Sequence, residues 1–133
     1  MTTPTNRDVP YSLDAVFESA SDAIVMAGSD GVIRALNPAA RTMFGYSSEQ
    51  AVGQRLAMLV PERFREAHEA GLARVVATGK TRIVGQTVEV FGLHSDGHEF
   101  PIELSLATWV DVDERYFCGI IRDISERVEM TRA

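Results

Sequence analysis

Residues 23–45, AIVMAGSDGVIRALNPAARTMFG, contain the pattern that decides the fold. Their first five residues form an apolar run typical of a buried strand, and the SDG that follows is a turn that leads into a second apolar run, VIRAL. Asn37 and Pro38 are typical of an N-cap and a first helical residue, and Gly45 is typical of a helix end. The stretch therefore predicts a β-hairpin followed directly by a short helix.

On both sides of this stretch, the spacing of apolar residues predicts further elements. In residues 100–107, FPIELSLA, apolar and other side chains alternate as in a strand with one buried face. Residues 61–79 have helical spacing instead, with proline at the first helical position. The expected helices are 13–20, 38–44, 48–53, 61–79 and 126–133; the expected strands are 23–27, 32–36, 83–92, 100–107 and 116–124, with an acidic loop at 110–114.

Two hairpins separated by helices predict an α+β fold, a five-stranded antiparallel sheet with helices on one face. We expect one domain over residues 11–125, preceded by a flexible lead at 1–10. A C-terminal signalling helix is expected to start within residues 126–133.

The composition is that of one soluble domain of 133 residues, 45% hydrophobic and 24% charged. The net charge is −6 and basic residues do not cluster, which argues against nucleic acid and anionic membranes as partners. No apolar run approaches the roughly 18 residues of a membrane span. With Cys118 as the one cysteine and no signal-peptide pattern, we expect a cytoplasmic protein.

Three stretches together resemble the PAS family, the sensory modules of bacterial signalling proteins. They are DAIVMAGSDGVIRALNPAARTMFGYSSEQAVGQ, HSDGHEFPIELSL and GIIRDISER, and the resemblance covers residues 13–127. It implies the PAS fold and a sensory role in a two-component system. Asp123-Ile124-Ser125 resembles the family's Asp-Ile-Thr ending, which implies a downstream signalling domain such as a histidine kinase. Since the sequence lacks phosphate-loop, GxSxG and HExxH motifs, we expect a regulatory sensor domain and not an enzyme.

His68 lies on the apolar side of the 61–79 helix. At about 100° per residue it shares that side with Phe64, Gly71 and Val75. Burying an imidazole without a partner costs about 1–3 kcal/mol, so a partner for His68 is expected. A mid-helix glycine costs about 0.5–1 kcal/mol relative to alanine, and close approach of a bulky planar group would explain Gly71.

The pattern Pro61-Glu62-x-x-Arg65-x-x-His68 resembles the FixL-type oxygen sensors, PAS domains that hold haem iron through a histidine of this helix. The resemblance implies that His68 is the metal ligand of a haem cofactor. It further implies propionate-binding roles for Arg74 and Arg82. The remaining residues implied to line the cofactor are Gly71, Ile83, Val88, Leu104 and Leu106.

Val88 stands where those sensors have an arginine that hydrogen-bonds to bound oxygen. Valine offers no donor, so among diatomic gases the resemblance favours carbon monoxide or nitric oxide over dioxygen as the ligand. Gly71 stands where a bulkier aromatic residue is common in those sensors.

Other interpretations stay open. His68 can instead be a structural histidine bonded to a carbonyl or a water, in a haem-free PAS domain that binds another small ligand or acts only in dimerisation and signal relay. The amphipathic helix at 13–20 and the exiting helix favour a homodimer. His94, His98 and Cys118 suggest zinc as a further possibility, but a hairpin turn explains the two histidines without a metal.

Overall fold

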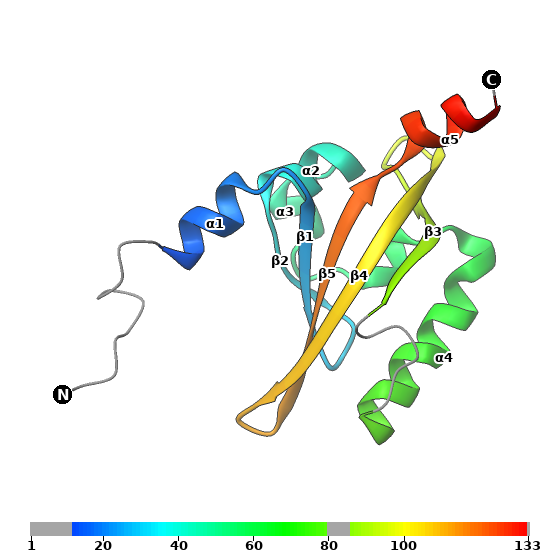
Figure 1. Ribbon diagram of the computed structural model, residues 1–133. Coiled ribbons are helices and arrows are strands. Elements are labelled where there is room, and N and C mark those ends of the chain that lie inside the picture. The colour runs from blue at the N-terminus through cyan, green and yellow to red at the C-terminus, as the bar shows by residue number, and fades with distance from the viewer. Residues whose placement is uncertain (1–11, 80–85, 133) are drawn as a thin grey trace.

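The computed structural model describes residues 12–79 and 86–132, and the strands it describes form one antiparallel sheet (Figure 1). The strand order is β2-β1-β5-β4-β3. The last strand therefore lies between two hairpins, β1–β2 and β3–β4, and joins them. The strands are β1 (Ala23–Gly28), β2 (Ile33–Leu36), β3 (Thr87–Leu93), β4 (Glu99–Asp111) and β5 (Glu114–Asp123). The predicted five-stranded antiparallel α+β fold is confirmed.

The helices α2, α3 and α4 lie on one side of the sheet, whereas α1 projects away from it (Figure 1). Within the described ranges no helix is both long enough and apolar enough to cross a bilayer. The helical segments are α1 (Leu13–Ser19), α2 (Pro38–Phe44), α3 (Ser48–Ala51), the 3₁₀ segment η1 (Leu56–Leu59), α4 (Glu62–Thr78) and α5 (Ser125–Arg132). The sequence did not predict η1.

Asn37 joins β1 to α2 through its buried side chain. Its Oδ1 accepts the N–H of Ala40 at 3.0 Å, which caps α2, and also the N–H of Ile24 at 2.9 Å. Its Nδ2 donates to the carbonyl of Asp22 at 3.0 Å. The predicted N-cap is confirmed, and the same amide also fixes the start of β1 against the helix.

The core lies between the sheet and these helices. Phe44 at the end of α2 contacts Phe100 on β4, with ring centroids 5.4 Å apart. Ile33, Ile102 and Ile121 complete the centre of the cluster from three different strands. Burial of such side chains is worth roughly 1.5–3 kcal/mol each. The alternation predicted for β4 is confirmed at Phe100 and Ile102, both buried.

The prediction of an acidic loop at 110–114 is wrong. β4 continues to Asp111 and β5 begins at Glu114, so only Val112 and Asp113 form the turn. Both residues have positive φ, 48° and 63°. The longer ladder is supported by cross-strand contacts such as the stacked rings of Trp109 and Tyr116, with centroids 6.0 Å apart.

Two expectations fall partly or wholly outside the described residues. The lead at 1–10 lies outside them entirely. The first residues of the strand expected at 83–92 also lie outside them, and β3 begins at Thr87. The exiting helix begins at Ser125, one residue before the expected 126.

Candidate ligand site around His68

His68 lies on α4 and is half-buried. Its Nδ1 is enclosed by protein and has no hydrogen-bond partner among the described residues. Val75, two turns further along the same side of α4, is 5% exposed. Leu72 also packs inward, because its Cδ2 would lie 2.7 Å from a Cβ placed on Gly31 in the β1–β2 turn. The imidazole is therefore turned toward the body of the domain.

α4 is held in place by arginines on either side of this inward strip. Arg65 donates from Nε to the carbonyl oxygens of Ala57 and Val60, at 2.9 and 3.0 Å. Arg63 forms an ion pair with Glu99 at the start of β4. Arg65 of the Pro-Glu-x-x-Arg pattern therefore has a structural role, which is to anchor the start of α4 on η1.

Phe64 differs from the expectation that it faces inward with His68. It is 41% exposed, and the guanidinium of Arg63 lies 4.5 Å above its ring. The same guanidinium is 5.7 Å from the ring of Phe91 on β3. The N-terminal end of α4 thus contacts the sheet through Arg63, and the ring of Phe64 lies at the surface and not in the core.

Burial lowers the pKa of His68 below its ordinary value of 6.5. The carboxylate of Glu69 acts in the opposite direction and raises this pKa, while the guanidinium of Arg55 lowers it. A lowered pKa keeps the imidazole neutral at pH 7, with a nitrogen lone pair available for a metal or a hydrogen-bond donor. The sequence patterns did not indicate that Arg55 and Glu69 lie near His68 and affect its pKa.

Gly71 lies one turn after His68, and the space beside it is open. A Cβ added at Gly71 would meet only the Nη2 of Arg74 within 4 Å among the described side chains, at 3.9 Å. Arg74 itself is exposed. No contact among the described residues therefore requires glycine at this position, and a group from outside the chain has room to approach.

The apolar residues predicted to line the ligand meet on the sheet. Val88 on β3 and Leu104 on β4 are register partners, and both are half-buried. Leu106 is half-buried on the same strand, opposite Gly119 of β5. Arg82 and Ile83 lie outside the described residues. The structure thus brings Val88 and Leu104 together on the sheet, and Arg74 belongs to α4.

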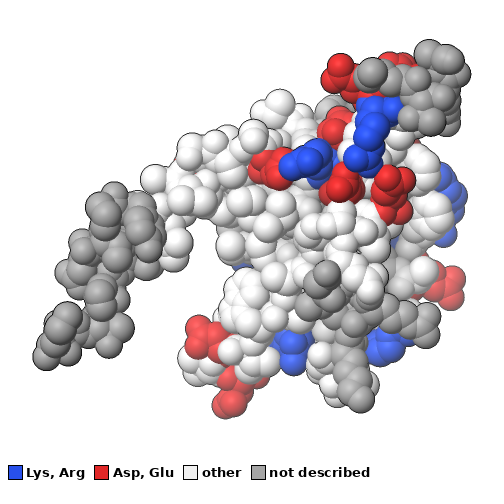
Figure 2. Space-filling view, in the orientation of Figure 1, with Lys and Arg blue, Asp and Glu red and all other residues white. Residues whose placement is uncertain are grey.

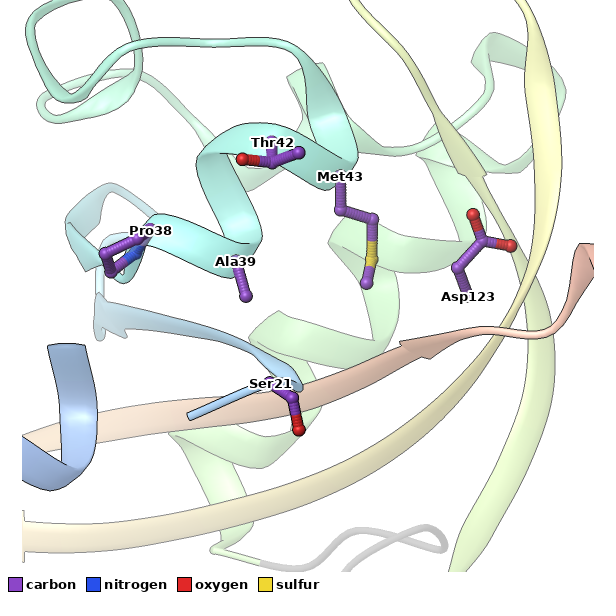
Figure 3. Close-up of a pocket in the computed structure, with 6 residues that line it drawn as sticks. All are labelled: Ser21, Pro38, Ala39, Thr42, Met43 and Asp123. Carbon is purple, nitrogen blue, oxygen red and sulfur yellow. The ribbon is translucent and has the colours of Figure 1, made fainter. Parts of the chain in front are cut away.

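A shallow surface depression of about 440 Å³ lies elsewhere, beside α2 (Figure 3). Asp123 at its edge is already engaged, because its Oδ1 accepts from the backbone N–H of Ser125 at 2.9 Å and from the Ser125 hydroxyl at 2.6 Å. None of the predicted site residues lines it. The lining residues are Ser21, Pro38, Ala39, Thr42, Met43 and Asp123.

A family model described as PAS fold matches residues 11–124 of the chain. The chain belongs to the PAS family. A solved PAS domain from Colwellia psychrerythraea is 32% identical to this PAS domain, with a TM-score of 0.72, over 86% of this chain and 95% of that one. Fold and family therefore agree across most of the chain.

Two relatives of this PAS domain are signalling proteins. Sensor protein FixL of Bradyrhizobium diazoefficiens is 32% identical over 114 residues, which is 86% of this chain and 23% of that protein. The cell-division control histidine kinase PdhS of Brucella ovis is 26% identical, over 86% of this chain and 11% of that protein. The chain thus spans less than a quarter of either relative. The identity to FixL over most of the chain supports the FixL-like resemblance of this PAS domain.

Proposed function

We propose that this PAS domain is the sensory part of a longer cytoplasmic signalling protein and binds haem through His68. The observation that carries the proposal is the enclosed Nδ1, which lacks a partner among the described residues. An unpaired buried nitrogen is costly, so a partner from outside the described residues is expected for this ring, and haem iron is the partner that the FixL-like resemblance implies. The open space directly beside Gly71 lets a group from outside the chain approach the helix closely.

The other residues have roles that follow from their chemistry. The exposed guanidinium of Arg74, next to Gly71, suits a propionate carboxylate. Val88 and Leu104 provide apolar surface on the sheet. Arg82 and Ile83 are proposed for the same site on the resemblance alone. When bound, haem would supply an iron centre for a diatomic gas, and Val88 offers no hydrogen bond to favour dioxygen.

The spectrum of protein reconstituted with hemin tests the proposal. Wild-type protein is expected to give a Soret band that His68→Ala loses, whereas His98→Ala, which removes an exposed histidine, keeps it. Far-UV circular dichroism confirms that the variants are folded. If the wild-type protein leaves hemin unbound, or if His68→Ala keeps an unchanged haem spectrum, His68 is not a haem ligand.

We infer that the signal reaches α5 through Arg127. Its guanidinium pairs with Glu89 on β3 at 2.9 Å and with Glu103 on β4 at 3.1 Å. Each glutamate is the chain neighbour of a proposed ligand-lining residue, Val88 or Leu104, whose side chain points to the opposite face of the sheet. A ligand that binds two packings of these strands with different affinity would therefore shift α5 and the output domain beyond it.

Pairing of two copies is a second candidate function, favoured by α1. No residue of α1 is buried, and Leu13 and Val16 are 58% and 55% exposed. Figure 2 shows charged side chains gathered toward the α5 end, while most of the remaining visible face is uncharged. The apolar side chains of β4 and β5 include Trp109 and Ile120, which are 41% and 42% exposed. A homodimer in which α1 covers apolar surface would bury these groups.

Sedimentation velocity tests this second function separately. The wild-type chain is expected to be a dimer, and Leu13→Glu with Val16→Glu is expected to make it monomeric without changing its circular dichroism. His68→Ala should stay dimeric, because His68 lies outside the proposed interface. A monomeric wild type, or a dimer that survives both glutamates, would show that α1 does not pair the copies.

A further inference from the structure

The tip between β3 and β4 carries two histidines and an aspartate whose side chains converge. Each offers one ligand atom, and these atoms of His94, Asp96 and His98 all lie within 4.8 Å of one another. Oδ1 of Asp96 is 3.2 Å from Nδ1 of His94 and 2.6 Å from Nδ1 of His98. The imidazole rings stack with centroids 4.7 Å apart. Alternate residues of the tip thus direct three donor groups to one place.

The backbone around these groups is well fixed. The N–H of His94 donates to the carbonyl of His98 at 2.9 Å, which closes the hairpin. The N–H of Ser95 donates to the carbonyl of Phe44 at 2.9 Å, which ties the tip to the end of α2. The ring of His94 lies so close to Gly45 that an added Cβ would come within 2.5 Å of it. The backbone that carries the donor residues is therefore held in position before any ion binds.

Two imidazole nitrogens and one carboxylate oxygen are a donor set suited to zinc and its neighbours among the divalent transition metals. Bonds of 2.0–2.2 Å in a tetrahedral site place donor atoms about 3.3 Å apart. The 3.2 Å separation of Asp96 and His94 already matches this value. The exposed ring of His98 can turn to open its shorter contact. Coordination at Nδ1 of His94 would replace the hydrogen bond that this atom accepts from the N–H of Asp96, at 3.1 Å.

Cys118 does not take part in this cluster. It lies on β5, in register between Met26 of β1 and Ala107 of β4. Burial raises the pKa of its thiol, which disfavours the thiolate that zinc would need. Asp96, and not the cysteine weighed from the sequence, is the residue that accompanies the two histidines.

We propose that His94, Asp96 and His98 form a binding site for a divalent transition-metal ion of the zinc class, with water completing the coordination. The bound ion joins the end of β3 to the start of β4 while the tip stays hydrogen-bonded to α2. It therefore stiffens the hairpin that carries Val88 and Leu104. This site shares no residue with the proposed haem site, so metal binding would act on the domain independently of haem.

Calorimetric titration of tag-free protein with Zn²⁺ tests the proposal. The wild-type chain is expected to bind one equivalent, and Co²⁺ in its place is expected to give the visible absorption of a coordinated ion. His98→Gln and Asp96→Asn should each weaken Zn²⁺ binding at least about tenfold, because three donors become two. His68→Gln removes the only other histidine and should leave the affinity unchanged.

Three outcomes would overturn the site. The first is that the wild-type chain takes up no Zn²⁺ even in large molar excess. The second is that His98→Gln and Asp96→Asn bind Zn²⁺ as tightly as the wild type. The third is that Mg²⁺ binds as well as Zn²⁺, which would indicate a merely acidic surface. His98 is exposed and its side chain lies outside the core, so His98→Gln is expected to fold normally. Thermal unfolding with and without Zn²⁺ gives a second readout, since an ion that binds only the folded chain raises Tm.

Discussion

Arg55 and Glu69 form an ion pair with 2.6 Å between Nη2 and Oε2, and Glu69 is the chain neighbour of His68. The two charges act in opposite directions on the pKa of the imidazole. Both side chains are substantially exposed, so the pair contributes at most about 1 kcal/mol to stability. Its larger effect is electrostatic, on the half-buried imidazole of His68.

Removing either charge should move the titration of His68 in a direction fixed by its sign. Glu69→Gln is expected to lower the pKa of His68 further, because a raising influence is lost. Arg55→Gln is expected to raise it. Proton NMR of the imidazole follows both changes, and Asp96→Asn serves as a distant charge control. Equal titration of His68 in wild type and both variants would show that these charges do not reach the ring.

Acid should destabilise the protein through His68. Because its folded pKa lies below the unfolded value of 6.5, the unfolded chain binds the proton more readily. The free energy of unfolding is therefore unaffected by His68 above that value and falls as the pH drops from 6.5 to the lowered folded pKa. Urea unfolding at several pH values should show a steeper decline for the wild type than for His68→Gln. Parallel declines in the two proteins would contradict the burial of this imidazole.

Asn37→Ala should be strongly destabilising, by about 2–4 kcal/mol. The change removes a helix cap and also leaves the N–H of Ile24 and the carbonyl of Asp22 without their buried amide partner. Ser47→Ala is the matched control, since Ser47 caps the exposed start of α3 and should cost only about 0.5–1 kcal/mol. Urea unfolding measures both, and equal losses would mean that the link from Asn37 to β1 adds nothing.

The β4–β5 turn should become more stable when its residues match its backbone. Val112 and Asp113 have φ of 48° and 63°, and Asn-Gly is the preferred pair in such a turn. Val112 is 90% exposed, so its replacement loses little packing. Val112→Asn with Asp113→Gly is expected to raise the free energy of unfolding by about 1 kcal/mol. A lower midpoint in thermal unfolding would indicate that Val112 makes a stabilising contact.

Arg127→Gln should loosen α5 without unfolding the domain. Its ion pairs with Glu89 and Glu103 are partly exposed, so global stability should change by less than about 1 kcal/mol. Amide hydrogen exchange within α5 should nevertheless become faster, because the helix loses its link to two strands. Arg34→Gln, which removes ion pairs with Asp30 and Glu114 on the β2 side of the sheet, is the control and should leave α5 unchanged.

Local chemistry made part of this structure predictable. The cap at Asn37 and the glycine end at Gly45 depend on neighbouring residues, and both were found where the sequence indicated. The turn at Val112 and Asp113 was missed because a β-branched valine is untypical of positive φ and no glycine follows it. The strands close the turn through pairs further along the ladder. The sequence therefore predicts which helices and strands form better than it predicts where a strand ends, because tertiary contacts set those ends.

The same limit holds for the candidate site. The helical period placed His68 inward, but it could not show that Arg55, thirteen residues earlier, reaches Glu69 and affects the ring. Nor could it show that the carboxylate of Asp96, a turn residue by pattern, contacts both imidazoles. Both arrangements depend on how separate segments fold against one another or on side-chain direction within a turn, which residue spacing alone does not encode.

The central position of β5 has a consequence for how the protein is made. Until that strand leaves the ribosome, the two hairpins have no common neighbour, and β1 and β4 each present an unpaired edge. The domain therefore cannot complete its sheet during most of its own synthesis, and its nascent chains are open to pairing with one another. Folding is completed by nearly the last described segment to emerge, so truncation within residues 114–123 should remove the whole fold and not only one edge of it.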